Sequence, residues 1–353
     1  MKNLIPSRLA LAILGLTVMA SCSHTRNVSF NITQPADITL PHDVNTMLMI
    51  DRTKFANGWL NTVEGILTGE LPTDDRNAAK ECLASLKKKL DQSPRYQAKI
   101  LNDRFDGNSI TATFPPPLSW DFIKGLCRDN QADVVVALEV FDSNFIITNG
   151  TRIKKRTEGS GDSKHEVEYT EYYASGVGSV KIGIRTYYAN GEKIVDEQMF
   201  HKSNTWEATG LSALDAVSAL ISKSNANKHL ASIVGDDYAY KVSPMTVRVS
   251  RQFYGKSKHY PEVAEGSRYA DVNQWEQAIE SWKRGLDKSS GKDAGEMAHN
   301  IAVANEVLGN YGEALTWAQT AYTRYGNKQS MYYVHTLQNR IDEEAVLKDQ
   351  MER

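Results

Sequence analysis

The chain has 353 residues, more than most single hydrophobic cores enclose, so two domains are expected. Its formal net charge is −2, and removal of residues 1–21 with Lys2 and Arg8 would change it to −4. This balance, in a composition typical of globular proteins, gives no reason to expect nucleic acid or an anionic membrane surface as a partner.

The first 21 residues have the pattern of a secretory signal peptide. Lys2 and Arg8 precede an apolar run from Leu9 to Ala20, and this run is too short to cross a bilayer. The sequence "MASC" that ends at Cys22 closely resembles the lipobox of bacterial lipoproteins. The resemblance implies that residues 1–21 are removed and that Cys22 is lipidated, and a buried cysteine in an N-terminal helix is the alternative. Several acyl chains on one cysteine would anchor the protein stably.

The residues after Cys22 bear on where such a lipoprotein would be sorted. Position 23 is a serine and not the aspartate that often retains lipoproteins in the inner membrane. No acidic cluster of the kind that marks surface export follows it. The resemblance therefore implies the periplasmic face of the bacterial outer membrane, with the membrane met through the lipid anchor only.

The elements expected first are a tether and two strands around a helix. Residues 22–44 contain Pro35 and Pro41 and are expected to be a lipidated tether with a little extended structure. Residues 46–52 and 95–105 are expected to be strands, and residues 75–92 an amphipathic helix with a lysine-rich outer face.

Further along the chain, residues 119–130 are expected to form a helix with Ser119 as its N-cap. The β-branched run at 132–141 predicts a central strand that is buried on both faces. The basic stretch at 152–156 is either an anion-binding or lipid-headgroup patch or, as its acidic neighbours favour, part of the solvated tip of a hairpin.

The next pattern is a hairpin followed by a helix. Alternating apolar residues from 178 onward, an Asn190-Gly191 turn and a returning strand predict the hairpin. Residues 209–235 are expected to be one helix, capped by Thr209 or Ser212, whose inward side chains are Leu214, Val217 and Ile221.

The order of these elements predicts an α/β (α+β) sandwich domain with a mixed sheet at residues 45–245. This order, with the run at 132–141 after a helix, resembles the small α/β domain of envelope lipoproteins such as the curli-secretion channel and the activators of peptidoglycan synthases. The whole pattern also resembles an uncharacterised family of bacterial envelope lipoproteins in which such a domain precedes tetratricopeptide-like (TPR) repeats.

From residue 258 the pattern is that of an all-α repeat domain. Gly266 and Tyr269, followed by Ala278 and Trp282, resemble the tetratricopeptide repeat, and a second copy follows after 36 residues. Two repeats are expected at 258–328, with a capping helix at 329–353. Because about three repeats are normally needed for such a stack to be stable alone, this pair is expected to pack against the α/β domain. The residues expected to pack the repeats together are Gly266, Tyr269, Trp275, Ala278, Trp282, Tyr311 and Ala314.

Such repeats hold a peptide or a partner helix on a concave face made by the first helix of each pair. On this pattern the partner-binding groove would be lined by Ser267, Ala270, His299, Val303, Glu306, His335 and Asn339. The groove lacks the lysine and asparagine set with which some repeats bind a terminal carboxylate.

No catalytic, cofactor-binding or metal-binding motif stands out in the sequence. Cys82 and Cys127 each lie on an apolar helical face and are expected to be buried thiols, with a disulfide as the alternative. The expected function is that of a protein–protein interaction adaptor that uses its repeats and takes no cofactor. The alternatives are an enzyme that acts on the cell wall, a subunit of an envelope secretion or assembly complex, and a purely structural envelope protein.

Overall fold

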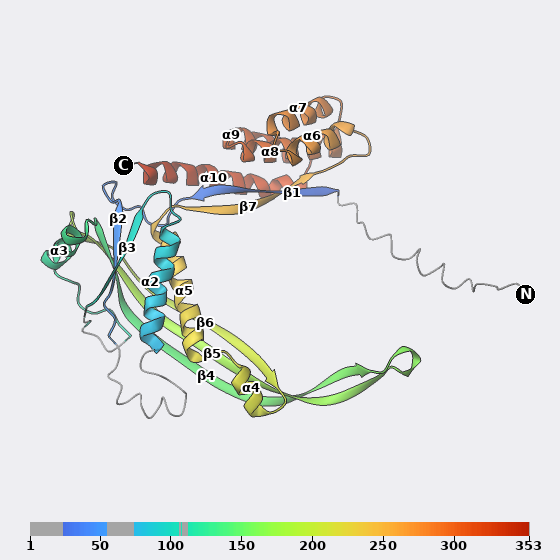
Figure 1. Ribbon diagram of the computed structural model, residues 1–353. Coiled ribbons are helices and arrows are strands. Elements are labelled where there is room, and N and C mark those ends of the chain that lie inside the picture. Colours follow the sequence, from blue (N-terminus) through green and yellow to red (C-terminus); the bar gives the residue numbers. More distant parts are fainter. Residues whose placement is uncertain (1–23, 55–73, 106, 108–111, 353) are drawn as a thin grey trace, which may run out of the picture. The chain divides into compact units, whose positions relative to one another are not determined.

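The computed structural model describes residues 24–54, 74–105, 107 and 112–352, which divide into two compact units (Figure 1). Residues 33–246 and 347–352 form what we call the α/β unit, and residues 24–32 and 247–346 form the helical unit. The signal peptide expected at 1–21 and the expected lipidation site, Cys22, lie outside the described residues. The fold class expected from the sequence, a mixed α/β domain followed by an all-helical region, is confirmed.

The α/β unit contains a five-stranded mixed sheet with the order β3-β2-β4-β5-β6. β2 pairs in parallel with both β3 and β4, and the later pairs are antiparallel. The first three strands are therefore parallel, as the crossover rule predicts. The strands are β2 (Thr46–Asp51), β3 (Gln97–Arg104), β4 (Val134–Glu158), β5 (His165–Tyr188) and β6 (Lys193–Gly210).

Helices cover both faces of this sheet. α2 (Asp74–Leu90) and α5 (Lys223–Val242) lie side by side on one face, and α3 (Trp120–Asn130) packs on the other (Figure 1). Cys82 belongs to the core under α2, and Cys127 belongs to the core under α3. Both cysteines are free and buried. Two separate cores thus hold the two thiols on opposite sides of the sheet.

β4 and β5 continue beyond the helices as a long antiparallel arm (Figure 1). Its short tip includes the 3-10 turn η1 (Gly161–Ser163). The basic residues of the arm face acidic residues across the strands, because Arg152 lies 2.6 Å and Lys154 2.8 Å from the carboxylate of Glu171. The stretch at 152–156 is therefore part of a charge-paired, solvated hairpin.

The prediction of a single helix at 209–235 is wrong. β6 extends through Gly210, and two helices follow: α4 (Ala213–Ala219) and then α5. Two serine caps divide them, since the hydroxyl of Ser212 accepts a hydrogen bond from the Asp215 N–H and that of Ser222 accepts one from the Asn225 N–H. Leu214, expected to point inward, is 75% exposed on the short helix.

The helical unit contains antiparallel helix pairs. The turns after the first helix of each pair are equivalent, because Asn273 and Gly309 lie 36 residues apart and both have a left-handed backbone, with φ of 59° and 80°. The helices are α6 (Pro261–Asp271), α7 (Trp275–Leu286), α8 (Gly291–Val307), α9 (Tyr311–Thr323) and α10 (Lys328–Met351), whose last residues belong to the α/β unit. No helix in the described part of the chain combines the length and the hydropathy of a membrane span.

A two-stranded sheet that the sequence analysis did not expect belongs with these helices. It pairs β1 (Thr25–Gln34) with β7 (Met245–Tyr254), and we call it the ribbon. The strands are antiparallel, since the Gly255 N–H donates to the His24 carbonyl at one end and the side chains of Thr33 and Thr246 meet at the other. The segment expected to be a tether at 22–44 holds a regular strand at Thr25–Gln34, longer than the little extended structure expected, and Leu40 and Val44 belong to the core of the α/β unit, so the prediction of a tether is wrong for these residues.

Candidate functional site

The concave face expected to be an open groove is filled by the chain itself. Five of the seven groove residues are buried, and the other two, His335 and Asn339 on α10, are exposed. The buried ones pack against β7 or in the core around Phe253 of that strand. The prediction of a groove open to a partner therefore does not hold for Ser267, Ala270, His299, Val303 and Glu306.

The helices hold the main chain of β7 by side-chain hydrogen bonds. The Asn300 amide donates to the Tyr254 carbonyl at 2.8 Å and accepts from the Tyr254 N–H at 2.6 Å. Ser267 donates to the same carbonyl at 3.2 Å, and the His299 ring lies 3.0 Å from the Gln252 carbonyl. Bonds of this kind recognise an extended backbone whatever its side chains are. The sequence analysis missed Asn300, although it follows His299 directly.

His299 is held neutral at the bottom of this face. Burial lowers its pKa to about 4, and its second ring nitrogen lies 2.9 Å from the Ser330 hydroxyl. A histidine so placed is a hydrogen-bonding residue of the core and is not open to a ligand.

An ion pair fixes which face of β7 points toward the helices. Arg251 reaches the carboxylate of Glu306 with two guanidinium nitrogens, each at 2.7 Å, and the hydroxyl of Tyr333 donates to the same carboxylate. Glu306 is 1% exposed, so its charge depends on these two partners. Burial raises the pKa of Tyr333 well above its usual value, which keeps the hydroxyl proton in place.

The expected packing residues form the aromatic centre of the helical unit. Trp282 is fully buried, and its indole N–H donates to the Val263 carbonyl at 3.2 Å. A methyl group at Gly266 would lie 2.4 Å from the indole nitrogen, so only glycine allows this approach. Phe253 contacts the rings of both tryptophans at 275 and 282. Trp275, Ala278 and Ala314 are buried, and Tyr269 and Tyr311 are half-buried.

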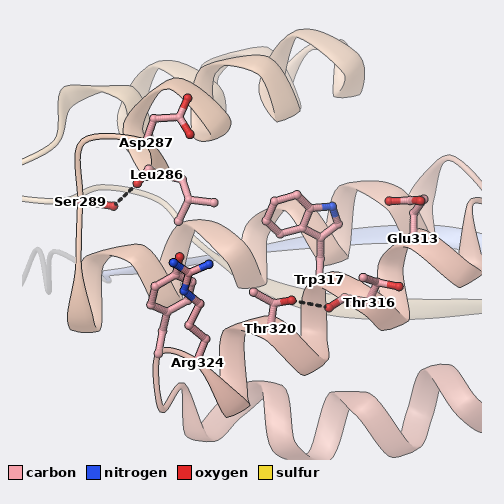
Figure 2. Close-up of a pocket in the computed structure, with 9 residues that line it drawn as sticks. Leu286, Asp287, Ser289, Glu313, Thr316, Trp317, Thr320 and Arg324 are labelled. Carbon is pink, nitrogen blue, oxygen red and sulfur yellow. Dashed lines mark hydrogen bonds between the residues drawn. The ribbon is translucent and has the colours of Figure 1, made fainter.

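An open pocket of about 520 Å³ lies between α7 and α9 (Figure 2). The half-buried indole of Trp317 and the side chain of Leu286 form its apolar part, and Glu313 and Arg324 lie toward its two ends along α9. The Lys283 ammonium lies 5.7 Å from the Trp317 ring centre. The pocket is completed by Asp287, Ser289, Thr316, Thr320 and Tyr325.

The α/β unit holds a buried charge cluster on its third strand. Glu139 is fully buried, with its carboxylate 3.0 Å from Arg52, 2.7 Å from Arg185 and 2.7 Å from the Tyr187 hydroxyl. Burial raises the Glu139 pKa, while the hydroxyl and the two guanidinium groups lower it. The same guanidinium groups donate to carbonyls of the Pro115–Pro116 stretch. The cluster therefore fixes a crossover loop, and the carboxylate is closed to substrate.

Two family models match the chain. Residues 44–254 match the model described as "Domain of unknown function (DUF8603)", and residues 264–339 match "Domain of unknown function (DUF6340)". The first match includes β7, the strand that the helices bind. No curated protein matches the chain.

Several solved structures resemble the chain at low identity. The PelC dodecamer from Paraburkholderia phytofirmans is 11% identical, with a TM-score of 0.26, over 62% of this chain and 99% of that one. A putative neuraminyllactose-binding hemagglutinin homolog from Helicobacter pylori is 12% identical, with a TM-score of 0.24, over 58% and 94%. The hypothetical protein CT253 from Chlamydia trachomatis is 10% identical, with a TM-score of 0.21, over 55% and 96%.

Proposed function

The chain belongs to the family described as "Domain of unknown function (DUF8603)", and we propose that it works by binding other proteins. The proposal places it on the periplasmic face of the bacterial outer membrane, anchored through acylated Cys22 as the lipobox-like sequence implies. It acts there as an adaptor and not as an enzyme.

The observation that carries the proposal is the set of side-chain contacts by which the helices hold an extended strand. Side chains of α6 and α8 bond to the main chain of β7, and a carboxylate binds its arginine. Tetratricopeptide-like repeats use this chemistry to hold peptides. In this protein that face already carries β7, which stabilises the unit and leaves other surfaces for partners.

We place the partner contact at the pocket between α7 and α9 (Figure 2). Tryptophan and arginine are the residues most enriched at the centres of protein interfaces, and Trp317 and Arg324 both line this pocket. An apolar side chain of the partner would rest on Trp317 and Leu286, and polar groups would meet the hydroxyls and charges around them.

Site-specific photocrosslinking in cells tests the proposal. A photoreactive residue in place of the exposed Thr316, on the pocket, is compared with one in place of His335, which is exposed on α10. We expect a crosslinked product of defined mass from position 316 only, and its loss when Trp317→Ala is added. The matched control is Tyr332→Ala, because Tyr332 is an aromatic residue 72% exposed on α10.

Two results would contradict the adaptor function. One is the absence of any product from position 316, and the other is a product that Trp317→Ala and Tyr332→Ala reduce equally. Mass spectrometry of the isolated product identifies the partner.

The structure favours this proposal over an enzyme that acts on the cell wall. Within the part of the chain that the structure describes, Glu139 is the carboxyl group whose pKa is raised. Two arginines and a tyrosine surround it, so it has no open side toward a glycosidic or peptide bond.

A further inference from the structure

The start of β1 lies close to the proposed lipid. His24 follows Cys22 by two residues, which span at most about 7 Å when fully extended. The His24 carbonyl accepts a hydrogen bond from the Gly255 N–H at 2.9 Å, and its ring lies 2.9 Å from the carboxylate of Glu296 and edge-on to Tyr254. An acyl chain on Cys22, as proposed above, would therefore hold this end of the helical unit against the bilayer.

Positive side chains gather at this end. Lys256, Lys258 and His259 are exposed in the loop between β7 and α6, directly after the residue that binds His24. Lys292 lies in the first turn of α8, and its side chain is 86% exposed. Its ammonium is 3.7 Å from Glu296, the same carboxylate that binds His24.

The acidic groups nearby are already engaged. The Glu296 carboxylate lies 3.7 Å from Lys292, so its negative charge offsets at most one of the positive charges at this end. Among the described residues, the recorded ion pairs include none at Lys256 or Lys258. The other carboxylates near this loop are each held by a neighbour, Asp293 by the Ser257 hydroxyl and Glu262 by Lys288.

We infer that this end of the helical unit is a second membrane contact, at which Lys256, Lys258 and Lys292 bind the headgroups of anionic phospholipids. The inference rests on the proposed lipid anchor and adds to it a protein surface that lies on the bilayer. The whole-chain charge of −2 hides this surface, because the positive charge is local.

The anchor and the lysines reinforce each other. Each lysine held close to an anionic membrane strengthens binding roughly fivefold, so three contribute on the order of a hundredfold. An acyl chain alone leaves a protein free to rotate about its attachment point. The lysines would also fix the orientation of the helical unit on the membrane.

The test uses residues 22–353 with Cys22→Ser, which lack both the apolar run at 9–20 and the acyl group and leave the described structure unchanged. Co-sedimentation of this protein is measured with vesicles of neutral phosphatidylcholine and with vesicles that also contain phosphatidylglycerol. We expect binding to the anionic vesicles only, and a loss of that binding on the order of a hundredfold when Lys256, Lys258 and Lys292 are all changed to glutamate. Added salt should weaken the parent interaction.

A matched triple variant controls for net charge. Lys88, Lys164 and Lys193 are exposed lysines of the α/β unit, and their change to glutamate alters the total charge by the same amount. This control should bind anionic vesicles nearly as the parent does, and thermal melting checks that both variants are folded. Equal vesicle binding by the parent and the first triple variant, or equal losses in both variants, would overturn the inference, as would a parent with no preference for anionic vesicles.

The anchor is tested separately, by mass spectrometry of the N-terminal peptide from the native protein. An unmodified Cys22 would refute the anchor without affecting the vesicle result. An acylated Cys22 with no lysine effect would refute only the second contact.

Discussion

At the residue scale, Trp282 and Gly266 set the distance between α6 and α7. The indole lies directly against the glycine, and its N–H bonds to a carbonyl of the neighbouring helix. We expect Trp282→Ala to lower the free energy of unfolding by about 3–5 kcal/mol, because it leaves a large cavity in a core that cannot fully collapse.

Chemical denaturation checks this value, with Trp317→Ala as the comparison. Trp317 is half-buried beside the pocket, so its loss should cost clearly less. Equal losses for the two variants would mean that Trp282 is not the packing residue of this unit.

His299 makes the stability of the protein depend on pH. Its pKa is about 4 in the folded protein because of burial, and about 6.5 in an unfolded chain. Between these pH values His299 binds a proton in the unfolded chain but not in the folded protein. The free energy of unfolding therefore falls as the pH falls from 6.5 to 4. The full contribution is about 3 kcal/mol, and above pH 6.5 nothing is lost.

The measurement is urea denaturation at pH 7.5 and pH 4.5 for the parent and for His299→Gln, which keeps hydrogen-bonding groups but does not titrate. We expect the parent to lose more stability than the variant over this interval. A parent and a variant with the same pH dependence would show that His299 is not the responsible group.

At the element scale, the helices α6–α10 depend on β7. Residues 258–353 alone lack the strand, so Asn300, His299 and Glu306 lose their bonds to β7 and Phe253 is missing from the core. A buried polar group without a partner costs about 1–3 kcal/mol, so several together exceed the margin of a small domain. We expect this fragment to be poorly folded or to self-associate.

Circular dichroism melting and analytical ultracentrifugation check the fragment. A second fragment, residues 245–353, restores β7 and should gain a steeper melting transition. A monomeric fragment 258–353 that melts cooperatively would show that the helices need no strand.

The ribbon also shows which elements the sequence could predict. The helices α2 and α3 and the strand β2 were predicted to within a few residues, because side chains at local spacing define a buried face, whereas the strand expected at 132–141 runs to Glu158. β7 was missed because one of the side chains on its inner face is Arg251. A charged residue in the sequence normally indicates a position exposed to solvent, so the alternation of apolar and polar residues was not recognised. Its strand partner β1 lies more than 200 residues away, and no local pattern encodes such a pairing.

The candidate site, too, could be predicted only in part. Buried packing residues such as Trp282 and Ala278 could be identified from a repeat spacing. The groove could not, because whether a face is open depends on what else in the chain covers it. The lysines at 256, 258 and 292 lie far apart in sequence from His24, so only the fold brings them together.

At the scale of the whole molecule, the proposed lipid anchor would decide where the protein is found. We expect Cys22→Ala to prevent acylation and to release the protein from the membrane fraction after a high-salt wash, which removes contacts made by lysines alone. Fractionation with palmitate labelling measures this. A variant that still sediments and still carries label would refute the lipobox interpretation.

The ribbon also sets the order in which this protein can fold. β1 ends at Gln34 and its partner strand β7 begins only at Met245, so β1 is made early and cannot pair until β7 exists. Contacts between such distant parts of a chain form slowly, because closing the long loop between them costs conformational entropy before the paired strands contribute any stability. A chain that leaves the ribosome N-terminus first therefore carries an unpaired β1 through most of its synthesis, and the helical unit closes only when the chain is almost complete.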